Sequence, residues 1–110
     1  MLRTNIEQAF VLVRVDSVIG FVVLIPINED CIELKRLYLT SSEREQKLGK
    51  YLLNYAINFA FKNRYRCIRL ETTSKFEKAV ALYKKHGFVE LKDVRKAPGH
   101  DLAFEKILEF

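Results

Sequence analysis

The sequence has few of the features that mark specialised protein classes. Four glycines and two prolines among 110 residues exclude a collagen-like or low-complexity polymer. No apolar stretch reaches the roughly 18 residues of a transmembrane helix, and no apolar run follows a basic start as in a secretory signal peptide. No block of about five or six like charges marks a solvated arm or tail.

Cysteine is also scarce. Cys31 and Cys67 lie in separate apolar segments and lack the CxxC spacing of zinc or redox sites. We therefore expect both to be small buried hydrophobes in a reducing, cytoplasmic protein. A buried thiol without a nearby histidine is inert, so Cys67 is not expected to accept an acyl group.

The composition itself is that of an ordinary globular chain. With 49% hydrophobic and 30% charged residues, the sequence predicts one soluble domain over residues 1–110. The net charge of +5 favours anionic partners such as phosphorylated cofactors or nucleic acid. Because the basic residues are scattered, a specific pocket is a better interpretation than a basic tail.

Hydrophobic periodicity predicts eight elements. Strands are expected over 8–15, 18–27 (ending near Pro26), 31–39, 66–73, 88–94 and 102–108, and helices over about 44–63 and 75–86. In the third strand, strict alternation puts Ile32, Leu34, Arg36 and Tyr38 on one face. A strand-helix-strand order implies one parallel pair. The predicted fold is therefore α/β (α+β), a mixed, mostly antiparallel sheet with two main helices.

Two capping boxes affect the helix starts. Ser74 with Glu77 predicts the start of the second helix, and Gly87 predicts its end. Ser42 with Glu45 would start the first helix near residue 43.

Four segments resemble the GNAT superfamily of N-acetyltransferases, namely ELKRLYL (33–39), REQKLGKYLL (44–53), RLETT (69–73) and AVALYKKHGF (79–88). The resemblance implies a GNAT-like sheet. It also implies a later start of the first helix, near residue 47, which we adopt in preference to the start near residue 43. It also implies direct transfer of an acetyl group from acetyl-CoA to a primary amine of a small molecule or a protein. Family members carry a further strand and helices before the first hairpin, and those helices form one wall of the acceptor site. This sequence reaches the predicted hairpin after about seven residues. The acceptor site is therefore expected to be open or to be completed by a second subunit.

The resemblance also implies a cofactor site. The pyrophosphate is expected at the helix start, where free backbone N–H groups and the helix dipole attract anions, through Arg44, Gln46, Lys47, Leu48, Gly49 and Lys50. The backbone of Leu37 and Leu39 is expected to hydrogen-bond the pantetheine arm.

Two residues depart from the family pattern. Lys47 replaces the first glycine of the phosphate segment; it would be strained at a positive φ and would add a phosphate contact at a negative one. Phe76 replaces an asparagine that contacts the cofactor, and Thr73 or Ser74 is expected to substitute for it.

Tyr83 and Glu33 are the expected catalytic residues. By resemblance Tyr83 protonates the leaving thiolate, a reaction suited to a phenol that stays protonated at neutral pH. The alternative is a core tyrosine packed on the sheet. Glu33, or a water, would deprotonate the acceptor ammonium; the alternative is a strand glutamate paired with Lys35 or Arg69. His86 and His100 are expected to be surface residues without a catalytic role.

Competing functions remain open at this point. The alternative to catalysis is a non-catalytic CoA or acyl-CoA binding module, motivated by Lys47, Phe76 and the short N-terminus. Nucleic-acid binding rests on the basic charge alone. No metal site is expected. An exposed sheet edge makes a homodimer a hypothesis.

Overall fold

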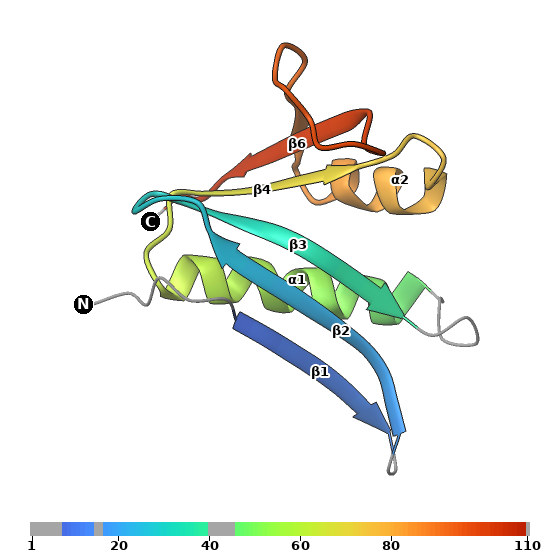
Figure 1. The fold of residues 1–110 in the computed structure, drawn as a ribbon. Helices are drawn as coiled ribbons and strands as arrows, with labels where there is room; N and C mark the ends of the chain where they lie inside the picture. The colour runs from blue at the N-terminus through green and yellow to red at the C-terminus, as the bar shows by residue number, and fades with distance from the viewer. Residues whose placement is uncertain (1–7, 15–16, 40–45, 110) are drawn as a thin grey trace.

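The computed structural model describes residues 8–14, 17–39 and 46–109, which form a six-stranded sheet with two helices (Figure 1). The strands are β1 (Gln8–Arg14), β2 (Ser17–Pro26), β3 (Cys31–Leu39), β4 (Cys67–Thr72), β5 (Val89–Glu90) and β6 (Leu102–Ile107). The helices are α1 (Gln46–Lys62) and α2 (Glu77–Lys85). Element order and the mixed, mostly antiparallel sheet confirm the predicted fold class.

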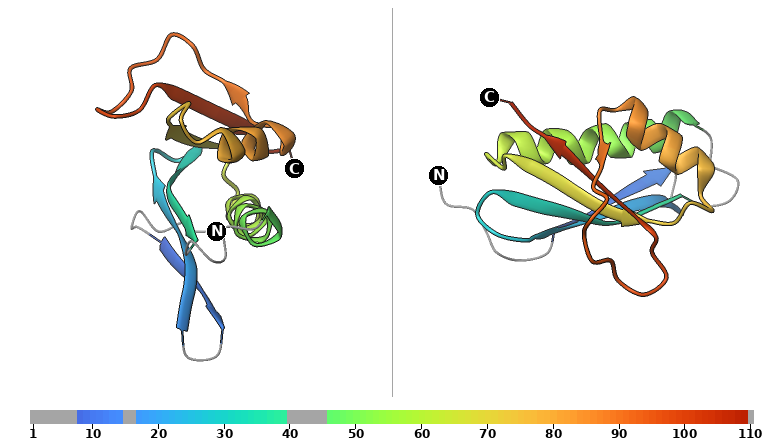
Figure 2. Two further views of the ribbon diagram at one scale, coloured as in Figure 1. Left: turned by 90° about the vertical axis from the view of Figure 1, so that its right-hand side faces the viewer. Right: turned by 90° about the horizontal axis from the view of Figure 1, so that it is seen from above.

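The strands lie in the order β1-β2-β3-β4-β6-β5, and among the described pairs β3 and β4 are the parallel one. A parallel neighbour requires a crossover connection, which α1 supplies. Helix α2 makes a second crossover, from β4 to β5 at the edge of the sheet. Both helices lie on one face, here called the helix face, whereas the connection over residues 91–101 lies on the opposite face (Figure 2).

The core fills the space between the helices and the sheet. Its sheet side consists of inward-facing strand residues, each at most 4% exposed: Val22, Leu24, Ile32, Leu34, Ile68, Leu70 and Phe104. Its α1 side consists of Leu52, Leu53, Ala56 and Ala60. These helix positions recur at the period of an α-helix, and their burial confirms the amphipathic pattern seen in the sequence.

Strand β3 departs from the predicted alternation in its second half. Its register with β2 shifts at Lys35, which is an extra residue in a β-bulge. The bulge brings Leu37 and Leu39 to the helix face and leaves Arg36 and Tyr38 exposed on the opposite face. The prediction that Arg36 and Tyr38 share the face of the first core residues is therefore wrong. Alternation along one strand cannot reveal a residue that its partner leaves unpaired.

Gly20 in β2 allows α1 to pack closely on the sheet. A Cβ atom at this position would lie 2.6 Å from Leu39 Cδ2, 2.7 Å from the Tyr38 carbonyl oxygen and 3.2 Å from Leu52 Cδ1. Contacts this short would displace backbone as well as side chains. Glycine is thus required here by close approach and not by a turn.

Helix α1 is described from Gln46 onward. The capping box at Ser42 and Glu45 lies outside the described residues, so the choice between the two predicted starts stays a prediction. Helix α2 begins later than its capping box predicts. Its N-cap residue is Phe76, which makes no side-chain capping bond. Ser74 instead donates its hydroxyl to Asp101, 27 positions away, at 2.7 Å. A local pattern cannot show such a long-range competitor.

The predicted strand over 88–94 is much shorter in the structure. Only Val89 and Glu90 pair with β6, and one further backbone bond joins the Leu91 N–H to the Ala103 carbonyl at 2.8 Å. The chain then leaves the sheet and crosses to the opposite face. Within the described ranges, neither helix is long and apolar enough to span a membrane.

Candidate active site

The parallel strands β3 and β4 diverge and form a fork. Their pairing covers three registers, from Cys31 opposite Cys67 to Glu33 opposite Arg69. Beyond that point the strands separate (Figure 1). We call residues 34–39 and 70–72, together with the last pair, the fork. Because no described strand pairs between its arms, backbone groups there can bind an extended ligand as a strand would.

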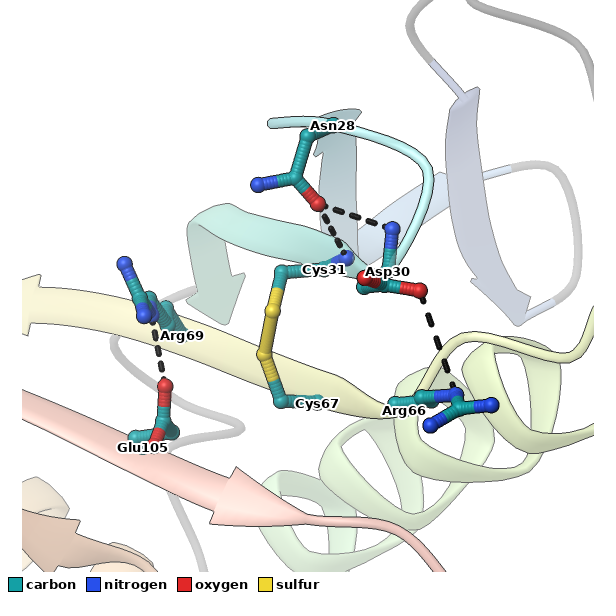
Figure 3. The surroundings of a disulfide bond; sticks show 7 residues. All are labelled: Asn28, Asp30, Cys31, Arg66, Cys67, Arg69 and Glu105. Carbon is teal, nitrogen blue, oxygen red and sulfur yellow. Dashed lines mark hydrogen bonds and ion pairs between the residues drawn. A yellow bond between two sulfur atoms is a disulfide. The ribbon is translucent and has the colours of Figure 1, made fainter.

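A disulfide joins the two strands at the closed end of the fork (Figure 3). Cys31 and Cys67 are register partners with Cα atoms 4.7 Å apart, and both are buried. The prediction that they are buried is confirmed, but the prediction that they are unpaired is wrong. The reason is the strand register, which places the two residues side by side although 36 positions separate them.

The turn before β3 is fixed beside this disulfide. The Asn28 side-chain oxygen accepts the backbone N–H groups of Asp30 and Cys31 at 2.8 and 2.9 Å (Figure 3). The Asp30 carbonyl in turn accepts the N–H of Arg66 at the start of β4. The closed end is therefore fixed by a covalent bond as well as by hydrogen bonds.

The segment resembling A-x-x-L-Y-x-x-x-G-F has a specific backbone geometry at the end of α2. Gly87 adopts φ +88°, and its N–H donates to the Lys84 carbonyl at 3.1 Å. The Phe88 N–H donates to the Tyr83 carbonyl at 3.1 Å. Together these bonds form a Schellman motif, with glycine in the left-handed position and tyrosine and phenylalanine in its apolar contact positions. The motif therefore fixes the position of Tyr83.

Tyr83 is buried, with 7% of its surface exposed. Its ring lies 5.9 Å from that of Phe88 and 6.3 Å from that of Phe104. Among the described residues the Tyr83 hydroxyl has no hydrogen-bond partner. Burial raises the pKa of Tyr83 above its ordinary value of 10.0, so the phenol keeps its proton at neutral pH. A buried hydroxyl without a partner costs free energy unless a ligand satisfies it.

Three segments named by the sequence meet near this tyrosine. A Cβ atom at Gly49 would lie 3.6 Å from Leu82 Cδ2 and 3.7 Å from Leu39 Cδ1. The start of α1, the end of β3 and the residue before Tyr83 are therefore neighbours. Leu48, half-buried, packs against the same core. The structure thus brings the predicted phosphate, pantetheine and catalytic segments together on the helix face.

The structure describes only some of the polar residues of the predicted phosphate segment. Gln46 and Lys47 are the first two residues of α1, and Lys50 is exposed one turn further on. Arg44 lies outside the described residues. The helix start gives the predicted anion site its backbone donors, because the first N–H groups of a helix have no partner within it.

Thr73 and Ser74 follow β4 at the open end of the fork. The Ser74 N–H and hydroxyl both donate to the Asp101 carboxylate, at 2.8 and 2.7 Å. Thr73 Oγ1 accepts the N–H of Lys75 at 3.3 Å. Ser74 thus joins the β4–α2 connection to the segment before β6, and its donors are already engaged.

Glu33 lies at the branch point of the fork, on the face opposite the helices, and is partly buried. Arg69, its register partner, binds Glu105 of β6 instead, with Nε 2.6 Å from the carboxylate (Figure 3). Glu33 has no ion pair in the described part of the chain. The pairing with Arg69 or Lys35 that the sequence left open is therefore not formed.

A second acid–base pair on this face was not expected from the sequence. Glu71 Oε1 lies 3.0 Å from His100 Nδ1 and accepts the Ala97 N–H at 2.9 Å. Burial raises the pKa of Glu71, but these hydrogen bonds, with the charges of His100 and Lys35, leave it below the ordinary value of 4.5. The one available signal was the alternation of β4, which puts Glu71 on the face of Arg69.

Solved structures define the class of this fold. A GNAT acetyltransferase from Staphylococcus aureus Mu50 superposes with a TM-score of 0.86 at 23% identity, over 96% of this chain and 70% of that one. At this identity the likeness shows the fold alone. A sequence model of the acetyltransferase (GNAT) family matches residues 2–88. The chain therefore belongs to the GNAT acetyltransferase family.

Two further relatives are informative. An uncharacterized N-acetyltransferase of Dictyostelium discoideum is 34% identical over 76 residues, 68% of this chain and 35% of its own length. The chain thus spans about a third of this curated relative. The PaiA N-acetyltransferase of Thermoplasma acidophilum, solved with coenzyme A, is 27% identical with a TM-score of 0.79, over 93% of this chain and 61% of that one.

Proposed function

We propose that the protein is an acetyl-CoA-dependent N-acetyltransferase that acetylates a primary amine by direct transfer. The observation that carries the proposal is the buried Tyr83 hydroxyl, which has no hydrogen-bond partner among the described residues. Tyr83 directly follows Leu82, whose side chain lies near Gly49 and Leu39. Family membership and a relative solved with coenzyme A support it.

The helix face fits the cofactor. The backbone of Leu37 and Leu39 would hold the pantetheine arm, and the first turn of α1, from Gln46 to Gly49, would hold the pyrophosphate. Ser74 donates to Asp101, and the Thr73 hydroxyl is hydrogen-bonded to Asp101 and to the Lys75 N–H, so a polar contact from either residue to the cofactor would have to replace one of these bonds. A tight fit is expected, since Gly49 packs against two leucines without a side chain of its own.

Acetyl-CoA, when bound, supplies a thioester whose acetyl group is transferred and whose sulfur leaves as a thiol. Tyr83 holds its proton at Oη until the sulfur can take it, and burial keeps the phenol protonated at working pH. Backbone N–H groups on the β3 arm orient the carbonyl and stabilise its developing negative charge. Core packing excludes water from the phenol.

The acceptor approaches from the other face of the sheet, where the charged side chains of the fork lie. An amine reaches the site as an ammonium ion and becomes a nucleophile only after losing a proton. Glu33, at the branch point of the fork, would attract that charge and, directly or through water, accept the proton.

A Tyr83→Phe variant tests this function. We expect kcat to fall by about 10²–10⁴-fold, because the phenolic proton is lost. Affinity for CoA should change little, since the ring and its Schellman contacts remain. The assay follows thiol release from acetyl-CoA with a panel of primary amines (a polyamine, an arylalkylamine, an aminoglycoside and a lysine peptide), and calorimetry measures CoA binding.

A matched control is Tyr65→Phe, which removes the hydroxyl of another buried tyrosine, located at the closed end of the fork. It should keep its turnover. Equal turnover in wild type and Tyr83→Phe would refute Tyr83 as the acid. CoA binding by wild type without turnover of any amine would favour the non-catalytic binding module.

A further inference from the structure

The most developed polar arrangement outside the predicted site is the contact between Glu71 and His100. Glu71 lies on the β4 arm of the fork, two positions after the last paired residue, Arg69. One of its carboxylate oxygens accepts the Ala97 N–H at 2.9 Å and lies 3.0 Å from His100 Nδ1. The pair therefore lies on the same face as Glu33 but on the other arm.

Several bonds hold His100 in this place. The His100 N–H donates to the Ala97 carbonyl at 3.1 Å, in a turn where Gly99 adopts φ +86°. The Asp101 N–H donates to the Thr72 carbonyl at 3.2 Å, and the Asp101 carboxylate accepts both donors of Ser74. The connection is thus fixed to the β4 arm on both sides of the imidazole, on the face opposite the helices (Figure 2).

The hydrogen bond determines which nitrogen of the imidazole is reactive. An ionised carboxylate only accepts hydrogen bonds, so Nδ1 of His100 must donate to Glu71. In the neutral ring this leaves the lone pair on Nε2. The charges that act on the Glu71 carboxylate are those of His100 and of Lys35 on the β3 arm, and they favour its ionised form. A carboxylate that orients an imidazole and stabilises its protonated form is the arrangement of a general base.

We propose that Glu71 and His100 form a proton acceptor for the ammonium group of the acceptor, in addition to Glu33; this rests on the proposed function. The proton passes from the ammonium nitrogen to Nε2 of His100. The electron pair of the broken N–H bond stays on the nitrogen as the lone pair that attacks. The imidazolium charge is balanced by the Glu71 carboxylate, and no further reactant is needed.

The proposal makes the pH profile diagnostic. Because only the unprotonated imidazole can accept the proton, kcat/KM should show an acidic limb. His100→Gln should remove this limb and lower kcat/KM at pH 8 by about 10²-fold. Glu71→Gln should move the limb to lower pH, because the protonated ring loses its counter-charge. His86→Gln, which changes the other histidine of the chain, should keep the limb.

A second measurement does not depend on turnover or on folded variants. Imidazole ¹⁵N shifts of the wild-type protein report the tautomer, and signals from two histidines can be told apart. We expect the Nδ1–H form for His100; the Nε2–H form would overturn the proposal. A limb that persists in His100→Gln would overturn it while leaving the proposed function intact. No turnover of any amine by wild type would overturn the proposed function, and the base with it.

Discussion

The two faces of β4 differ although their residues alternate along one strand. Ile68, Leu70 and Thr72 are buried beneath the helices. Arg69 and Glu71, between them, point to the opposite face and bind charged or polar groups of β6 and of the connection over 91–101. One face is stabilised by excluding water and the other by matched charges.

The difference separates contacts within the segments that resemble the GNAT superfamily from contacts between residues far apart in sequence. The segments that resemble the GNAT superfamily meet on the helix face, where packing fixes Tyr83 and Gly49. The opposite face, where an acceptor would approach, is held by contacts between residues far apart in sequence, such as Glu71 with His100. The helix face therefore indicates the type of reaction, whereas the opposite face is expected to select the acceptor.

The largest effect should come from adjacent substitutions on the two faces. Leu70→Ala removes a side chain that is 2% exposed and should lower the free energy of unfolding by about 2–5 kcal/mol. Arg69→Ala removes a partly exposed ion pair with Glu105 and should cost about 1 kcal/mol or less. Urea denaturation measures both. Equal losses would show that the faces do not differ as described.

On the face opposite the helices, the disulfide differs from the other contacts because it stabilises the fold by a covalent bond. Its bond between Cys31 and Cys67 closes a loop of 36 positions, and reduction should lower the free energy of unfolding by about 2–4 kcal/mol. Urea denaturation with and without a phosphine reductant tests this. A double Cys→Ser variant should match the reduced protein and ignore the reductant. No effect on wild type would mean that the thiols are unpaired in solution.

The smallest effect should be a change in the free energy of unfolding at acid pH, which arises from two carboxyl groups on the face opposite the helices. Hydrogen bonds from Ser74 hold the pKa of Asp101 below its ordinary value of 3.8. The pKa of Glu71 is raised by burial but lowered more by Ala97, His100 and Lys35. Carboxyl groups with lowered folded pKa values stabilise the fold above their unfolded pKa values, and this contribution is lost as pH falls through the folded values.

The free energy of unfolding should therefore decrease from about pH 5 toward pH 2. A Glu71→Gln, Asp101→Asn double variant should show a flatter dependence, as measured by urea denaturation across this range. Glu29→Gln, which changes an exposed carboxyl outside these contacts, serves as the control. An unchanged slope in the double variant would assign the acid dependence to other groups.

The sequence predicted the helix face well, because its information is local. Periodicity placed α1, and the Tyr83-to-Phe88 spacing encodes one backbone motif. Prediction from the sequence failed where a contact depends on the register between strands or on residues far apart in the sequence. The bulge at Lys35 and the Cys31–Cys67 bond need strand pairing, and the Ser74–Asp101 contact joins separate loops.

The most direct test of the central claim, that the helix face of the fork holds a CoA ester, is calorimetric titration with acetyl-CoA and CoA. ATP serves as the control for non-specific phosphate binding. We predict micromolar affinity for both CoA forms and much weaker affinity for ATP, because the β3 arm recognises pantetheine and ATP has none. Absence of CoA binding, or equal binding of ATP, would contradict the claim.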